Sequence, residues 1–120
     1  MKNEIKTSFG RIVIAEEVIA TIAGMAAVEC YGLVGMASRK IKDGIVELLR
    51  KDNLSRGVEV IVRDDDVFIN LYIIVGYGVK ISEVAHNVME KVKYSIEHIT
   101  GLKVAKVYVN VQGVKVSKDK

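Results

Sequence analysis

The stretch from Phe68 to Leu102 constrains the fold of this chain more than any other. It opens with an almost unbroken apolar run, FINLYIIV, turns at Gly76-Tyr77-Gly78, and continues into ISEVAHNVMEKVKYSIEHIT, which Gly101 closes. Apolar residues in the second part recur three or four positions apart, which predicts one apolar stripe along a helix. The apolar stripe of such a helix must pack against another apolar surface, and the strand before it is the nearest candidate. The stripe comprises Ile81, Val84, Ala85, Val88, Met89, Val92, Ile96 and Ile99.

The length and composition of the chain favour a single domain over residues 1–120. A chain of 120 residues is the size of one domain with one core, and half of its residues are hydrophobic. There is no proline, and no Gly/Ser-rich stretch marks a linker. The lone Cys30 allows no disulfide within the chain.

The first third is predicted to form a strand and a helix. Residues Thr7 to Ala15 alternate as in a short strand, with Phe9, Ile12 and Ile14 as candidate core positions. A helix from Glu16 to about Tyr31 follows, and it is apolar almost all round. Either its own domain or a second subunit must therefore bury it on several sides.

The middle of the chain is predicted to hold a second helix and a hairpin. Gly32-Leu33-Val34-Gly35 is expected to be a loop, followed by a helix from about Arg39 to Lys51. Alternation over Val58–Arg63 predicts a strand, which turns through Asp64–Asp66 into the apolar strand.

The last strand is expected from Ala105, with a phase shift at Gly113 that indicates a bulge. The predicted order is β-α-α-β-β-α-β. That order favours an α+β two-layer sandwich, KH-like or ferredoxin-like, with a mostly antiparallel sheet packed against helices.

No catalytic, cofactor-binding or metal-binding set stands out. His86 and His98 lie about 120° apart on their predicted helix, so they cannot share a metal. Cys30 has no nucleophile signature, and the glycines around Tyr77 fit a steep turn better than a phosphate loop. We therefore expect no enzyme.

An RNA-binding alternative rests on the loop and the basic residues after it. The K-homology fold has a similar order, with a GxxG loop that clamps a nucleic-acid backbone. Against this, Leu33 and Val34 offer a phosphate no hydrogen bond, and the net charge is only +3. The basic segment could equally meet a lipid surface or a protein. Its members are Arg39, Lys40, Lys42, Arg50, Lys51 and Arg56.

A second candidate surface is the sheet face turned away from the long helix. Aromatic and basic residues on an open sheet can stack bases or receive a protein partner, and we expect a partner or another subunit. Tyr72 and Tyr108 are its main candidates. The residues predicted to share this face are Arg63, Phe68, Tyr72, Lys106, Tyr108 and Asn110.

Three separated blocks resemble the alkaline-shock-protein family, the envelope-stress-response proteins of Gram-positive bacteria. They are GRIVIAEEVIATIAGMAAVECYGLVGM, YIIVGYGVKISEVAHNVMEKVKYSIEHITGL and VYVNVQGVKV, and together they span most of the chain. The segment SRKIKDGIVELLRKDNLSRG resembles the compact, housekeeping-type members.

The resemblance implies a non-enzymatic scaffold or adaptor that self-assembles and binds protein partners. It implies a cytoplasmic protein, peripheral to the membrane through an integral-membrane anchor protein, and companionship with a kinase-type protein in the short members. It supplies no agreed ligand or catalytic residue, so none is transferred. The sequence itself agrees in lacking a long apolar span, because a charge-free run such as Val18 to Val28 is too short to cross a bilayer.

Overall fold

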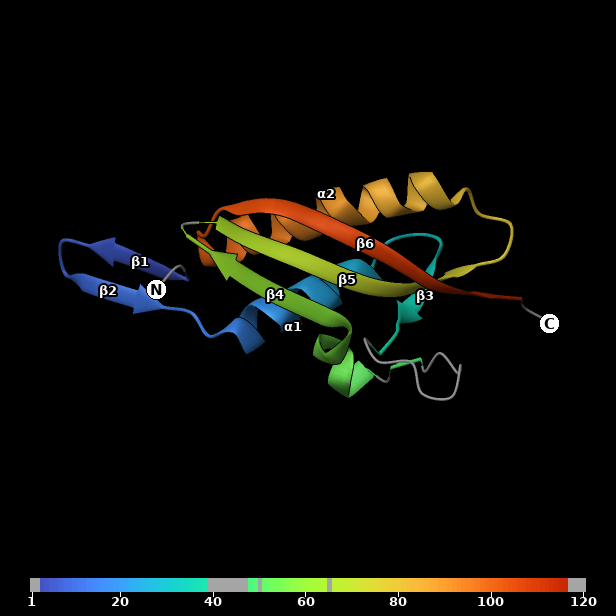
Figure 1. Ribbon diagram of the computed structural model, residues 1–120, viewed down its shortest axis with the longest axis horizontal. Helices are drawn as coiled ribbons and strands as arrows, with labels where there is room; N and C mark the ends of the chain where they lie inside the picture. The colour runs from blue at the N-terminus through green and yellow to red at the C-terminus, as the bar shows by residue number, and fades with distance from the viewer. Residues whose placement is uncertain (1–2, 39–47, 50, 65, 117–120) are drawn as a thin grey trace.

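The computed structural model describes residues 3–38, 48–49, 51–64 and 66–116, except for the side chains of Lys51 and Asp52. A four-stranded sheet forms one layer and both helices form the other, while a separate two-stranded hairpin extends from one end (Figure 1). In chain order the elements are β1 (Glu4–Thr7), β2 (Gly10–Val13), α1 (Glu16–Val28), β3 (Leu33–Met36), the 3-10 segment η1 (Lys51–Gly57), β4 (Val58–Arg63), β5 (Asp66–Gly76), α2 (Ile81–Thr100) and β6 (Val104–Lys115).

Strand β5 is the centre of the main sheet. Strand β6 pairs with it in parallel along one edge, from Val67 to Gly76. The other edge is shared, because β4 pairs antiparallel with Asp66–Leu71 and β3 with Ile73–Val75. The predicted β4–β5 hairpin and the bulge near Gly113 are both confirmed. The α+β class with a mostly antiparallel sheet against helices is confirmed as well.

The core lies between the sheet and the two helices. Alternate residues of β5 point toward the helices, and Ile69, Leu71 and Ile73 are fully buried. They join a stripe on α2 formed by Val84, Val88, Val92 and Ile96. The predicted helix, and its packing against the preceding strand, are therefore confirmed. Only the ends of the predicted stripe are wrong: Ile81 and Ile99 are exposed, since they lie at the helix termini.

Helix α1 is buried along one side by its own subunit. Its small residues let neighbouring elements approach closely, and a Cβ added at Gly24 would lie 3.1 Å from the Leu54 Cβ. Ile19, Ala23 and Ala27 are fully buried. Of the two alternatives that the sequence left open, burial within one domain accounts for one side of this helix, while Val18 and Met25 stay exposed.

The predicted strand from Thr7 to Ala15 is instead half of a separate hairpin. Strands β1 and β2 pair antiparallel around a turn in which the Phe9 N–H donates to the Thr7 hydroxyl at 3.2 Å. Phe9, predicted to lie in the core, is 100% exposed, and Ile12 is half exposed. The local turn divides the alternating run in two, so of the three predicted core positions only Ile14 packs against the main core, where it is partly buried.

The segment after α1 also differs from the prediction. Leu33–Met36 is strand β3, not a loop, because Met36 finds a fully buried place at the edge of β5. The predicted helix over 39–51 is wrong at its end, where Leu48 bridges Ala37 and a 3-10 segment begins. Residues 39–47 and 50 of that helix lie outside the described part of the chain.

A polar latch ties the end of α2 to the start of β6. The Glu97 carboxylate accepts from the Val104 N–H at 2.9 Å and from the Lys93 ammonium at 3.0 Å, and Lys93 also donates to the Val104 carbonyl at 2.7 Å. The hydrogen bond from the Val104 N–H has the largest effect on the pKa of Glu97, and the hydrogen bond from Lys93 the next largest. Both hold that pKa below its ordinary value. Gly101 makes the turn between them in the left-handed region, at φ 81°.

We predict that Ile96→Ala lowers the free energy of unfolding by about 3 kcal/mol, because it leaves a cavity between α2 and the sheet. The matched control is Ile99→Ala on the same helix, where the side chain is 65% exposed. We expect that change to cost less than about 0.5 kcal/mol. Urea unfolding measures both, and equal losses would contradict the assigned core.

We predict that Glu97→Gln destabilises the protein at neutral pH by about 1 kcal/mol, because it weakens the latch. Since the pKa of Glu97 is lower in the folded chain, its contribution is present above the unfolded pKa of about 4.3 and is lost as the pH falls through the folded value. Urea unfolding at neutral and acidic pH should therefore show the difference from wild type shrinking on acidification.

The control for this prediction is Glu90→Gln. Glu90 lies on the same helix, and among the described residues its only recorded partner is the exposed His86, at 3.2 Å. A constant Glu97→Gln effect at every pH would contradict the role given to the carboxylate.

Candidate interaction surfaces

The face of the sheet opposite the helices is open in the part of the chain that the structure describes (Figure 1). The parallel register sets Phe68 beside Lys106 and Tyr72 beside Asn110, while Ile61 of β4 lies opposite Phe68. The residues that the alternation predicted to share this face therefore do share it. We call this surface the open face.

A polar ladder crosses the open face over three strands. Asn110 of β6 donates to the Asn70 side-chain carbonyl at 2.6 Å and to the Leu71 backbone carbonyl at 3.0 Å. Asn70 in turn donates to the Glu59 carboxylate of β4 at 3.4 Å. All three side chains belong to half-buried residues, so the ladder favours one register of β4, β5 and β6.

Sequence reasoning named Asn110 but missed its partner Asn70, and it missed Glu59, which accepts a hydrogen bond from Asn70. The available signal was Asn70 itself, a single amide inside the apolar run of β5. A polar side chain in such a run needs a partner on a neighbouring strand. The identity of that partner depends on the strand register, which the sequence alone does not supply.

Aromatic side chains flank the ladder. Tyr72 and Phe68 are half-buried on β5, and Tyr108 of β6 is 49% exposed. Arg63 and Lys106 add positive charge at exposed positions on the same face. Aromatic rings beside hydrogen-bonding amides are typical of surfaces that bind other proteins.

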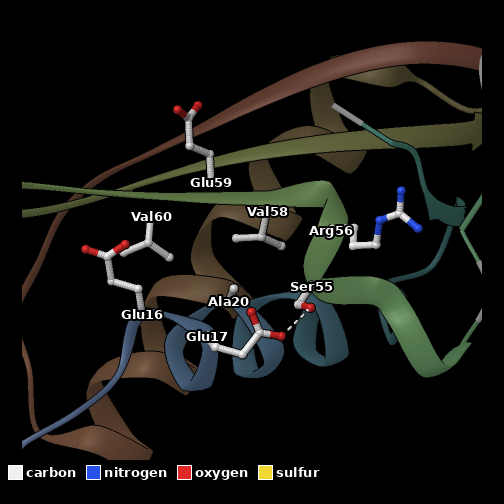
Figure 2. A pocket seen from close by; sticks show the side chains of 8 residues that line it. All are labelled: Glu16, Glu17, Ala20, Ser55, Arg56, Val58, Glu59 and Val60. Atoms are coloured by element: carbon white, nitrogen blue, oxygen red, sulfur yellow. Dashed lines mark hydrogen bonds between the residues drawn. The ribbon is translucent and has the colours of Figure 1, made fainter. Parts of the chain in front are cut away.

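A groove of about 370 Å³ lies between α1, η1 and β4 (Figure 2). In Figure 2, Glu59 points away from α1, whereas Val58 and Val60 point toward it. Since consecutive strand residues point to opposite faces, a groove touching all three follows the edge of β4. The walls are Glu16, Glu17 and Ala20 of α1, Ser55 and Arg56 of η1, and Val58, Glu59 and Val60 of β4.

The groove is mostly acidic. Ser55 donates to the Glu17 carboxylate at 2.8 Å, and Glu59 accepts from Asn70 on the open face. No described side chain makes a recorded ion pair or hydrogen bond with Glu16, which is exposed. Arg56 is the one basic residue among the lining residues.

The predicted site residues fall into separate places. Tyr72 and Tyr108 lie together on the open face, and Arg56 is exposed at the groove. The remaining basic residues cannot be placed against them: Arg39, Lys40, Lys42 and Arg50 lie outside the described residues, as does the Lys51 side chain. The glycine loop on which the RNA-binding alternative depended is replaced by strand β3.

The histidines and the cysteine have ordinary surroundings. His86 faces Glu90 at the surface, and the His98 ring stacks on Tyr94 with centroids 5.3 Å apart. Among the described residues, no group of three or more His, Cys, Asp or Glu side chains could hold a metal ion. Burial raises the pKa of the half-buried Cys30 thiol, an effect that Lys91 opposes, so the thiol is a poor nucleophile at neutral pH.

The Gly76–Gly78 turn does not present its first two amides to a ligand. The Gly76 N–H donates to the Gly32 carbonyl and the Tyr77 N–H donates to the Lys115 carbonyl, each at 3.0 Å. These bonds join the turn to β3 and β6. They agree with the interpretation of the glycines as a structural turn.

Fold and surfaces together define a small α+β domain with helices on one face of its sheet and a polar, aromatic surface on the other. The chain belongs to the alkaline-shock-protein family, described as having a cell envelope-related function, whose family model it matches over residues 4–116. The resemblance carried by the three sequence blocks is thereby confirmed. No helix among the described residues is long and apolar enough to cross a membrane.

Two relatives align along almost their whole length. "Uncharacterized protein YloU" of Bacillus subtilis (strain 168) is 56% identical over 118 residues, covering 98% of each chain. "Uncharacterized protein Spy1614" of Streptococcus pyogenes serotype M6 (strain ATCC BAA-946 / MGAS10394) is 44% identical over 97% of each. The solved structure "MamM-CTD H285A" covers 87% of this chain and 100% of its own, with a TM-score of 0.49 at 13% identity. That level of similarity supports no functional argument.

We predict that Asn110→Ala lowers the free energy of unfolding by about 1–2 kcal/mol. The change removes two hydrogen bonds and leaves the side-chain carbonyl of the half-buried Asn70 without this donor. Lys106→Ala, at an exposed position on the same strand and face, is the control and should change stability by less than about 0.5 kcal/mol. Chemical unfolding measures the two variants. A neutral Asn110→Ala would mean that the ladder does not stabilise the sheet.

Proposed function

We propose that this protein is a non-enzymatic scaffold or adaptor of the cell envelope, which assembles with copies of itself and binds a protein partner through the open face. The observation that carries the proposal is the open face itself, where a hydrogen-bonded ladder is flanked by Tyr72 and Tyr108. The family's cell envelope-related function gives the setting.

The chemistry of the open face suits a protein better than a small molecule. It is a broad surface across three strands, and each aromatic residue presents an apolar ring with a polar tip. The ladder amides have fixed positions, so a partner's polar groups would meet oriented donors and acceptors. Such a combination favours one binding orientation over others.

The partner that we propose is an integral-membrane protein that holds the chain at the membrane surface. The described residues include no helix able to cross the bilayer, so an anchor would supply the attachment. A kinase-type companion is the other partner that the family resemblance suggests. Both would use protein–protein contact and require no catalytic group from this chain.

We predict that Tyr108→Ser together with Tyr72→Ser weakens partner capture about tenfold, because both aromatic contacts with the partner are lost. The measurement is co-purification of the tagged full chain from cells, with quantitative mass spectrometry of the captured proteins. Tyr31→Ser is the matched control, since Tyr31 is 90% exposed and lies outside the open face, between α1 and β3.

Unchanged capture by the double variant, with correct folding shown by circular dichroism, would contradict the role of the open face. A wild-type chain that stays monomeric at every concentration and captures no protein would contradict the whole proposal.

A further inference from the structure

Resting on the proposed self-assembly, we infer that the β1–β2 hairpin of one copy adds to the free edge of β4 in a second copy, inside the groove between β4 and α1. The exchange is reciprocal, so each copy gives a hairpin and receives one. The occupant of the groove is thus a second copy of this chain. Four features of the structure carry the inference.

The hairpin is an arm without enough of its own core. It extends from one end of a molecule measuring 56 × 29 × 23 Å (Figure 1). Ile5 packs partly against the core, but Ile12 and Val13 are each 51% exposed and Phe9 at the turn is fully exposed. A two-stranded hairpin is marginally stable alone in water, so this arm gains from a further strand beside it.

Strand β4 offers a bare edge. It pairs only with β5 among the described strands, which leaves its outer edge without a β-partner. Its sequence, VEVIVR, has strong strand propensity and contains neither Pro nor Lys, and its two charged residues are Glu59, which accepts a hydrogen bond from Asn70, and Arg63 at the end of the strand. An edge of this kind readily pairs with another chain.

The outer edge of β6 also lacks a partner among the described strands, but it is better protected. A bulge interrupts it where the register passes from Val111 to Gly113, and Lys106 and Lys115 are exposed along it. Bulges and lysines are common devices against edge pairing. The contrast favours β4 as the receiving strand.

Charge on the two surfaces is complementary. The groove walls carry Glu16, Glu17 and Glu59 against a single arginine. On the hairpin, Lys6 and Arg11 are cross-strand neighbours on one face, and Lys6 has no recorded ion pair with any described side chain. Arg11 pairs with Glu4 at 3.3 Å but keeps 70% of its side chain exposed. Strand addition would bring basic residues to an acidic wall.

The position of the arm suits a closed dimer. Only Ile14 and Ala15 separate β2 from Glu16, which is both the first residue of α1 and part of the groove wall. The base of each arm therefore lies beside its own groove. A two-fold axis near this point places each arm in the other copy's groove, and such an interface closes on itself instead of forming a fibre.

The test is a charge swap in the full chain, read by sedimentation velocity over a range of protein concentrations. Lys6→Glu and Glu16→Lys should each raise the dimer dissociation constant about tenfold, because each sets like charges against one another. The double variant Lys6→Glu/Glu16→Lys restores the opposite-charge contact and should dimerise nearly as wild type. Lys80→Glu, an exposed site before α2, is the control and should leave the dimer unchanged.

Rescue in the double variant supports the inference. Single variants that dimerise as wild type, or a double variant without rescue, would overturn it while leaving the open face and its partner untouched. A wild-type chain that is monomeric throughout would overturn this inference together with the proposed self-assembly. Circular dichroism and urea unfolding confirm that each variant is folded, and the two substituted side chains have no recorded partner within the described part of one subunit.

Discussion

The rest of the structure depends on hydrogen bonding along both edges of β5. One edge is filled by β6 and the other by β4 and β3 in succession, while one face is sealed by the helices. A strand placed in this way has almost no backbone group left for solvent, so its long apolar run is stable only when all its neighbours are in place. Helix α2 makes this possible by carrying the chain back for the parallel pairing of β6, and the Glu97 latch fixes where β6 starts.

This arrangement confines the polar and aromatic side chains of β5 to one side of the sheet. Apolar side chains of β5 point toward the helices. Its polar side chains lie on the other side, so they must find their hydrogen-bond partners on the open face. Asn70 does so through Glu59 and Asn110, which come from two different neighbouring strands. The polar ladder and the aromatic residues beside it are therefore a direct result of covering only one face.

The parts of the fold that depend on local patterning could be predicted from the sequence. The α2 stripe, the β4–β5 hairpin, the bulge and the membership of the open face all follow from periods of 3.6 or 2 residues. The missed parts depend on long-range pairing. Nothing within Leu33–Met36 reveals that an edge of β5 lies free to receive it, and Phe9 carries no sign that its strand pairs away from the core. The Asn70–Glu59 contact was missed for the same reason, because it requires the register between two strands.

Because β3 and β4 share one edge of β5, local opening of β5 requires both strands to separate from it. The two strands come from distant parts of the chain and hold opposite halves of β5, so neither can be removed without exposing part of the same central backbone. The amide hydrogens of β5 should therefore be among the slowest to exchange with deuterium, and they should do so through concerted opening. Within one subunit the β1–β2 arm lies outside this sheet, so in the monomer its amides can exchange while the remainder of the molecule stays closed.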